Sequence, residues 1–337
     1  MLKRSCFFLF CFIIFIGLSS CDAQNNPGQV RHMYKSIAFL NEISGKKTVA
    51  GIHNREPNDS PQRWTNQIFK LTGKYPGLWS GDFLFQSDNI TNRQVMISEA
   101  LRQWNNGALV NIMWHACNPA LTEPCGWDSA GVLSRLSDKE WKELITDGTV
   151  LNRSWKSRVD EICPFLESLR KNGVEVLWRP MHEMNQRAFW WGGRPGQDGT
   201  RKLYQMLHDY MVKEKGLTNL VWIWDLQDFP GLKDDIAFYD PGDGYWDIAA
   251  LDVYDKTGFT KGKYDMMMTA ARGKPLAIGE CDRLPTANQL LAQPAWVFFM
   301  GWSELVFSTN TKREILDLFQ SPMVVTLDNM PGWGMKN

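Results

Sequence analysis

The feature that most constrains the fold is a series of eight short apolar segments, each separated from the next by a longer stretch. The segments are apolar along their whole length, which is typical of strands in a parallel sheet that helices cover. They are residues 47–54, 75–85, 108–116, 174–183, 219–227, 246–255, 275–282 and 295–304. Stretches with helical periodicity between them include residues 93–107, 154–173 and 200–217. Eight strands alternating with helices predict an α/β protein built as a single (β/α)8 TIM barrel, which we assign to residues 36–337.

A doubly wound parallel sheet is the competing architecture. Such folds carry a glycine-rich phosphate-binding turn after the first strand. Neither a GxGxxG motif nor a P-loop follows residues 47–54, so the barrel is favoured.

The N-terminus has the pattern of a targeting segment. MLKR supplies positive charge, and CFFLFCFIIFIGL is an apolar run too short for a comfortable membrane span, which predicts a signal peptide over residues 1–20. The run ends in LSSC and resembles the lipobox of bacterial lipoproteins, in which the cysteine, here Cys21, is acylated. Residues 21–35 are then expected to form a flexible tether, and we expect a membrane-anchored lipoprotein of the cell envelope, periplasmic or on the outer-membrane surface. Plain secretory cleavage near Ala23 is the alternative.

The composition indicates an uncharged partner. Lysine plus arginine and aspartate plus glutamate are balanced at 37 each, so no nucleic-acid-binding surface is indicated. Sixteen tryptophans are several times ordinary usage, and flat apolar rings suit the flat faces of sugars, although most of them can equally belong to the core. We expect a monomer.

The cysteines indicate one disulfide and no metal. Cys117 and Cys125 flank a proline-containing loop in an exported chain, where a local disulfide is plausible. Cys163 and Cys281 are expected to be buried thiols. No CxxC spacing occurs, so a structural zinc site is not expected.

Polar residues close each predicted strand. In a TIM barrel the active site is formed at the C-terminal ends of the strands, so these side chains are expected to share one rim, although strand ends are also polar simply because loops begin there. The side chains are His53, Asn54, Asp82, Trp114, His115, Arg179, His182, Glu183, Asp225, Asp252, Tyr254, Glu280, Asp282, Trp302 and Glu304. Arg179 shares strand parity with Glu183, so we expect it to point inward one layer deeper, where a cation needs a partner.

Glu183 and Glu280 are the best pair for acid–base chemistry. Glycoside cleavage needs one protonated carboxyl group and one ionised carboxylate, and these two residues end strands on opposite sides of the barrel mouth. In a regular barrel their carboxyl groups approach to about 5 to 5.5 Å, the separation associated with retention of configuration. Arg179 is expected to keep the neighbouring nucleophile ionised, and Tyr254 to donate a hydrogen bond to it.

Several motifs together resemble glycoside hydrolase family 26, chiefly bacterial β-mannanases. They are GIHN at 51–54, MWHACNP at 113–119, WRPMHEMN at 178–185, FWWGG at 189–193, LDVYD at 251–255 and IGE at 278–280. The resemblance implies a TIM barrel without a cofactor, a retaining double displacement, Glu183 as general acid/base and Glu280 as nucleophile. It also implies that His115 and His182 contact sugar hydroxyls, that Trp302 lies under the sugar bearing the reactive carbon, and that Tyr254 steadies the nucleophile. Asp252 is assigned to substrate binding with them.

One position departs from the family pattern. Ala188 stands where the family commonly has a tryptophan, which removes an aromatic contact for the leaving sugar. Trp127, in the long loop after the third strand, is a candidate substitute, although it can instead pack on the cysteine loop. Trp190 and Trp191 either contact the sugar or form a structural cluster that supports Glu183.

The resemblance implies a β-1,4-linked mannan from plants as the substrate. β-1,3-Xylan and mixed-linkage β-glucan are the alternatives within the family, and endo or exo action is left open. A carbohydrate-binding lipoprotein without catalysis is the alternative of another class, but it would lack one of the two carboxylates. A metallohydrolase barrel is disfavoured because GIHN offers one histidine and only five occur in the chain.

Overall fold

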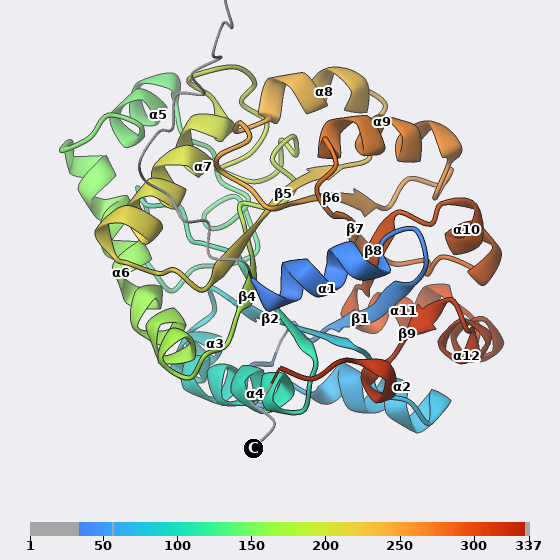
Figure 1. Cartoon of the computed structure of the whole chain (residues 1–337). Coiled ribbons are helices and arrows are strands. Elements are labelled where there is room, and N and C mark those ends of the chain that lie inside the picture. Colours follow the sequence, from blue (N-terminus) through green and yellow to red (C-terminus); the bar gives the residue numbers. More distant parts are fainter. Residues whose placement is uncertain (1–33, 56, 334–337) are drawn as a thin grey trace, which may run out of the picture. The chain divides into compact units, whose positions relative to one another are not determined.

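The computed structural model describes residues 34–55 and 57–333 (Figure 1). The predicted signal peptide, the acylated Cys21 and nearly all of the predicted tether lie outside the described residues. Within the described ranges, no helix combines the length and the apolar character needed to cross a membrane.

Eight parallel strands form a closed barrel, as predicted. Each strand pairs with the next along the chain, and the first closes the barrel by pairing with both the second and the eighth. The strands are β1 (Thr48–His53), β2 (Leu78–Phe83), β3 (Leu109–Trp114), β4 (Val176–Pro180), β5 (Leu220–Gln227), β6 (Ile248–Val253), β7 (Leu276–Cys281) and β8 (Trp296–Gly301). All their residues are buried except Gln227, because helices cover the outside and side chains fill the inside. A short ninth strand, β9 (Val324–Val325), which was not predicted, extends the sheet beside β1.

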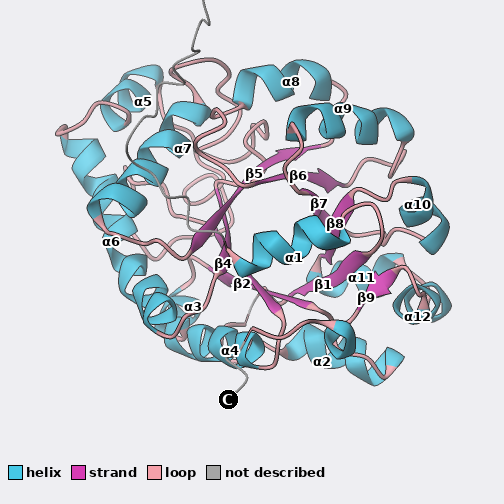
Figure 2. Ribbon diagram, in the orientation of Figure 1, coloured by secondary structure: helices cyan, strands magenta, loops and turns pink. Residues whose placement is uncertain are grey.

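Helices surround the strands on the outside (Figure 2). They are α2 (Arg63–Thr72), α3 (Ser87–Thr91), α4 (Arg93–Asn105), α5 (Asp138–Leu144), α6 (Val150–Lys171), α7 (Thr200–Asp209), α8 (Leu232–Tyr239), α9 (Lys261–Ala271), α10 (Ala287–Ala292), α11 (Ser303–Thr309) and α12 (Lys312–Gln320). The predicted helix over 200–217 is continued by a π-helix, η1 (Tyr210–Glu214), and a 3-10 turn, η2 (Leu327–Asn329), follows β9. The predicted helices that precede Gly107 and Gly173 end there, because these glycines adopt the left-handed backbone that stops a helix.

The first helix, α1 (Lys35–Ile43), covers the N-terminal end of the barrel. In Figure 1 it crosses the barrel opening. The backbone amides of Lys35 and Ser36 donate to the Glu175 carboxylate just before β4, and the Tyr34 hydroxyl donates to the carbonyl of Leu220 at the start of β5. With α1 across this end, the C-terminal ends of the strands are where a ligand site is expected.

The predicted side-chain environments are largely confirmed. Cys117 and Cys125 form a disulfide, and Cys163 and Cys281 are buried thiols. Thirteen of the sixteen tryptophans are buried, so most of them belong to the core. Trp127 is the most accessible, with 53% of its surface exposed.

Candidate active site

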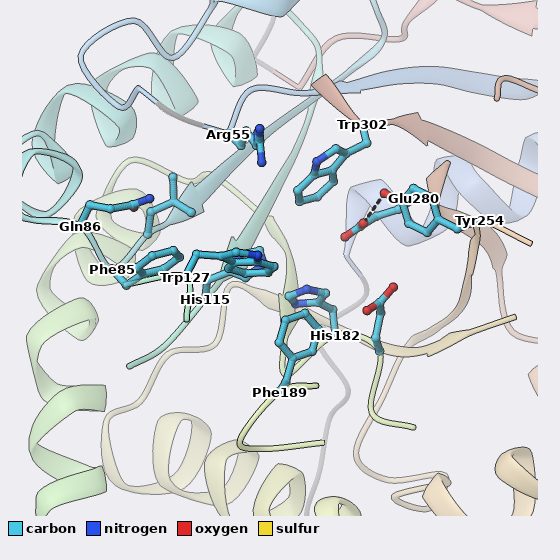
Figure 3. Close-up of a pocket in the computed structure, with 12 residues that line it drawn as sticks. Arg55, Phe85, Gln86, His115, Trp127, His182, Phe189, Tyr254, Glu280 and Trp302 are labelled. Atoms are coloured by element: carbon cyan, nitrogen blue, oxygen red, sulfur yellow. Dashed lines mark hydrogen bonds between the residues drawn. The ribbon is translucent and has the colours of Figure 1, made fainter. Parts of the chain in front are cut away.

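A cavity of about 350 Å³ lies at the C-terminal ends of the strands (Figure 3). Its lining comes from the loops after six of the eight strands and from Glu280 within β7, so the fold brings together residues far apart in sequence. The lining residues are Arg55, Leu84, Phe85, Gln86, His115, Trp127, His182, Glu183, Phe189, Tyr254, Glu280 and Trp302. Seven of these are predicted site residues, and both predicted carboxyl groups are among them.

Glu183 lies on a strained turn and not, as predicted, at the end of a strand. β4 ends at Pro180, because proline has no amide to continue the ladder and the next residues turn out of the sheet. Met181 and Glu183 both have a left-handed backbone, with φ of 48° and 49°. The strand-parity argument for Glu183 is therefore wrong, and such residues persist only where surrounding contacts hold them. One of these contacts is the hydrogen bond from the Glu183 amide to the Asp225 carboxylate, at 3.0 Å.

The environment of Glu183 favours its protonated form. The side chain is 6% exposed. Burial first, and then the negative charges of Glu280 and Asp225, raise the pKa of Glu183 well above its usual range. A carboxyl group in this state can donate a proton near neutral pH.

Glu280, in β7, is held by three hydrogen bonds. Both terminal nitrogens of Arg179 donate to its Oε1 at 2.7 Å, and the Tyr254 hydroxyl donates to its Oε2 at 2.7 Å, the dashed line in Figure 3. Burial raises the pKa of Glu280 to about 7, although Arg179 and Tyr254 both lower it. Arg179 lowers the pKa of Glu280, as expected, but the larger effect is the rise in that pKa caused by burial. One oxygen of Glu280 and one of Glu183 lie within 4.8 Å of each other.

Arg179 is buried with three carboxylates around it. Its guanidinium contacts Asp225 at 2.8 Å, Glu280 at 2.7 Å and also Asp252, which is the partner that the sequence argument required for a buried cation. Asp252 is fully buried and is not part of the cavity lining, so its predicted direct contact with substrate is not supported. Burial raises the pKa of Asp252 well above its usual range, although Arg179 lowers it.

A glycine makes room for these carboxylates. A Cβ atom at Gly279 would meet an oxygen of Asp252 at 2.5 Å and one of Asp225 at 3.0 Å, too close for any side chain. A register shift beside Asp252, between β6 and β7, accompanies this packing. Oxygens of Glu183, Asp252 and Glu280 come within 4.8 Å of one another, but the Arg179 guanidinium is bonded to two of these residues and would repel a metal ion.

His115 is oriented by a buried carboxylate. Asp82 Oδ2 lies 2.6 Å from His115 Nδ1, and Nε2 is therefore the nitrogen available to a ligand. Burial alone would raise the pKa of Asp82, but its contacts with His115 and His53 hold it well below its usual range. His53 Nδ1 in turn lies 2.8 Å from the Ser80 hydroxyl. Buried polar side chains behind His115 thus hold one another in place.

Uncharged rings form two more parts of the lining. Burial lowers the pKa of His182 well below its usual range, and its Nδ1 has no partner among the residues the structure describes. Trp302 stacks on the ring of His53, with centroids 4.3 Å apart and planes inclined by 21°. Burial lowers the pKa of His53 to about 4, so Trp302 rests on a neutral ring.

Aromatic side chains form the opposite wall. Trp127 lies 6.0 Å from Phe85 and 5.7 Å from Phe189, measured between ring centroids, and the Cys117–Cys125 disulfide closes the loop that precedes it. The structure thus favours Trp127 as a ring that faces the cavity. Ala188, exposed, is not part of the lining.

Trp190 and Trp191 form the structural cluster that the sequence left as one of two options. Each is 1% exposed, and neither lines the cavity. Trp190 Nε1 donates to the Ala116 carbonyl at 2.8 Å, and Trp191 Nε1 donates to the His182 carbonyl at 3.1 Å. They hold the loop after β4 in place.

Sequence reasoning missed five lining residues. They are Arg55, Leu84, Phe85, Gln86 and Phe189. Phe189 begins the quoted FWWGG motif, and the other four immediately follow the ends of β1 and β2, where barrel loops meet the cavity. Arg55 forms an ion pair with Glu304. Glu304, a predicted strand-end residue, therefore does not line the cavity itself but contacts a residue that does.

The chain matches known proteins over most of its length. The model of the family described as glycosyl hydrolase family 26 matches residues 25–329. A protein named mannan endo-1,4-beta-mannosidase from Thermothelomyces thermophilus is 28% identical, over 92% of this chain and 63% of its own length. One named mannan endo-1,4-beta-mannosidase A and B from Caldalkalibacillus mannanilyticus is 31% identical, over 90% of this chain and 62% of its own. The chain thus spans less than two thirds of these relatives.

Solved structures share the fold. The structure of GH26A from a Muricauda species superposes with a TM-score of 0.82 at 34% identity, covering 87% of this chain and 95% of that one. A beta-mannanase from a symbiotic protist of the termite Reticulitermes speratus, complexed with a gluco-manno-oligosaccharide, gives 0.76 at 26% identity, covering 88% and 93%.

Proposed function

Because the chain belongs to glycosyl hydrolase family 26, we propose that it is a retaining endo-β-mannanase that cleaves β-1,4-mannosidic linkages in mannan-type polysaccharides. The observation that carries the proposal is the approach of Glu183 and Glu280 to within 4.8 Å in surroundings that give them unequal proton affinities. Retaining glycosidases have carboxyl groups about 5 to 5.5 Å apart, whereas inverting enzymes need about 6.5 to 9.5 Å to admit a water molecule.

Each carboxyl group has a separate role. Glu280 attacks the anomeric carbon while Glu183 gives its proton to the departing glycosidic oxygen, so a covalent glycosyl-enzyme forms and the leaving sugar is released. Glu183, now ionised, takes a proton from water, which attacks the same carbon and returns Glu280 as a free carboxylate. Arg179 and Tyr254 donate hydrogen bonds that favour the ionised form of Glu280 before attack. The same bonds stabilise the carboxylate when it leaves the glycosyl-enzyme.

The remaining lining residues would position the sugar. Trp302 offers a flat ring beside the nucleophile, His115 offers Nε2 to hydroxyl groups, and the ring of His182 lines the cavity next to it. Trp127 and Phe189 would contact the opposite apolar face. No cofactor or metal enters these steps.

Mannan is proposed as the substrate because the curated relatives are named for it. The test is to incubate the protein with β-mannan, β-1,3-xylan and mixed-linkage β-glucan, and to follow the anomeric configuration of new ends by NMR. We expect mannan cleavage with retention, and a loss of about 100-fold or more in Glu183→Ala and in Glu280→Ala. Glu42→Ala, on the exposed face of α1, is the matched control. Full activity of both active-site variants would refute the assignment, and cleavage of xylan or glucan alone would replace the substrate.

We further propose that acylated Cys21 anchors the enzyme to a membrane, with residues 21–35 as tether and residues 36–337 as the catalytic domain. The LSSC motif after an apolar run supports this. The test is to fractionate cells that express the full chain or Cys21→Ser. The protein should move from the membrane to the soluble fraction on substitution, and an unchanged distribution would exclude the anchor.

A further inference from the structure

Asp225 contacts the backbone of Glu183 and the guanidinium of Arg179, which binds Glu280. It lies near the C-terminal end of β5 and is 1% exposed. One carboxylate oxygen accepts the Glu183 amide at 3.0 Å and lies 2.8 Å from an Arg179 nitrogen. The same guanidinium binds Glu280 at 2.7 Å. A single oxygen of Asp225 thus connects the backbone of one carboxyl residue with the cation that holds the other.

The bond to Glu183 opposes a local strain. Glu183 has a φ of 49°, a conformation that is unfavourable for a residue with a side chain. The Asp225 main chain adds a second contact, because its carbonyl accepts the Met184 amide at 3.2 Å. Loss of the carboxylate would leave the Glu183 amide buried without its acceptor, which favours relaxation of the turn.

The charge of Asp225 also acts on both carboxyl groups. Around Glu183, the charged groups are Glu280, Asp225, Arg179 and Asp228, and all of them except Arg179 raise its pKa, as burial does. Around Glu280, burial and Asp225 raise the pKa, whereas Arg179, Tyr254 and His115 lower it. Asp225 therefore favours a proton on Glu183 and also competes with Glu280 for Arg179.

We propose that Asp225 is a positioning residue shared by the two catalytic carboxyl groups, holding the strained backbone of Glu183 and the guanidinium that binds Glu280. The proposal rests on the proposed function, because it assigns Asp225 a part in that hydrolysis. Asp225 itself does not line the cavity and acts through its two neighbours.

The test is the pH profile of kcat/KM in Asp225→Asn. An asparagine keeps the shape and an oxygen acceptor for the Glu183 amide but removes the charge. Both limbs of the bell-shaped profile should move to lower pH by about half a unit or more, because Glu183 and Glu280 both ionise more readily. In Asp225→Thr, a shorter neutral side chain, the same shift should accompany a larger fall in kcat than rise in KM. Asp234→Asn removes an exposed carboxylate in nearby α8 and should leave the profile in place.

The outcomes separate this proposal from the proposed function. Wild-type protein that hydrolyses none of the three glycans overturns the function itself. If the wild type is active, a folded Asp225→Asn variant with lower kcat and an unmoved profile overturns the positioning role and leaves Asp225 as a packing residue. Should Asp225→Asn fail to fold in thermal unfolding, the profile of Asp225→Thr decides by the same criterion.

Discussion

Replacing Glu183, the proposed general acid, by glutamine should stabilise the protein at neutral pH. Glu183 is buried and its pKa is raised by burial and by neighbouring negative charge, so the folded protein keeps a proton that the unfolded chain releases. Between the usual pKa and the raised one, stability therefore falls as pH increases. A glutamine at this position keeps the shape but cannot ionise in either state. We expect the free energy of unfolding of Glu183→Gln to be higher than that of the wild type at neutral pH.

The magnitude follows from the linkage between proton binding and folding. Each pH unit within the window costs the wild type about 1.4 kcal/mol relative to the glutamine variant. Across this window the advantage of Glu183→Gln should therefore grow by this amount for each pH unit, up to the raised pKa of Glu183. Below the usual carboxyl pKa the two proteins should be nearly equal, because Glu183 is then protonated in both states.

Urea unfolding at pH 4, 5, 6 and 7 measures this difference. Glu42→Gln provides the control, because Glu42 lies on the exposed face of α1 and its carboxyl group stays in water in both states. A stability difference between Glu183→Gln and the wild type that stays constant across this range would refute the reasoning. It would mean that Glu183 is ionised in the folded protein, and the proposed proton donor would lose its basis.

Three further perturbations test other parts of the site. Tyr254→Phe removes a hydrogen bond that lowers the pKa of Glu280, so the acid limb of the kcat/KM profile should move up by about one pH unit, and an unmoved limb contradicts this contact. Gly279→Ala should lower kcat about 100-fold with the far-ultraviolet circular dichroism unchanged, because its Cβ displaces a carboxylate oxygen 2.5 Å away; wild-type kcat would exclude this crowding. Cys117→Ser should raise KM more than it lowers kcat, since it opens the loop before Trp127, and an unchanged KM would show that the loop is held without the bond.

The barrel was predictable because its signal is repeated and local. With eight apolar runs, an error in one of them does not change the predicted fold. Each observed barrel strand lies within its predicted segment. The ends were placed one to three residues too far out in most cases, because the motif residues that follow a strand also look strand-like. At β4 this error mattered, since Pro180 ends the strand and the prediction continued it to Glu183. No glycine or asparagine marks the left-handed backbone at Met181 and Glu183, so composition could not reveal the turn.

The cavity lining was only partly predictable, for a different reason. Six of the fifteen strand-end residues that were expected to share one rim line the cavity, since strand order determines which ends meet. Trp114 does not line it and stacks instead on Trp155 of α6. Phe85 and Gln86 lie in the loop directly after β2, and their direction depends on how that loop packs against the disulfide loop and Trp127. Such contacts are made between separate loops, and no sequence pattern in one loop indicates how it packs against the other.

The least predictable property is the acidity of the site. From the sequence, Arg179 and Glu280 form a simple pair in which the cation keeps the carboxylate ionised. In the fold, one guanidinium contacts three carboxylates while Glu183 lies beside them, so one arginine faces four buried acidic groups. All four cannot ionise together at moderate cost, and the group without a bond to Arg179 is the one expected to hold a proton. The protonated state of Glu183, on which its proposed role as general acid depends, thus follows from crowding around one arginine. That crowding depends on the tight packing at Gly279 and on Asp225, and no motif that contains Glu183 alone can encode it.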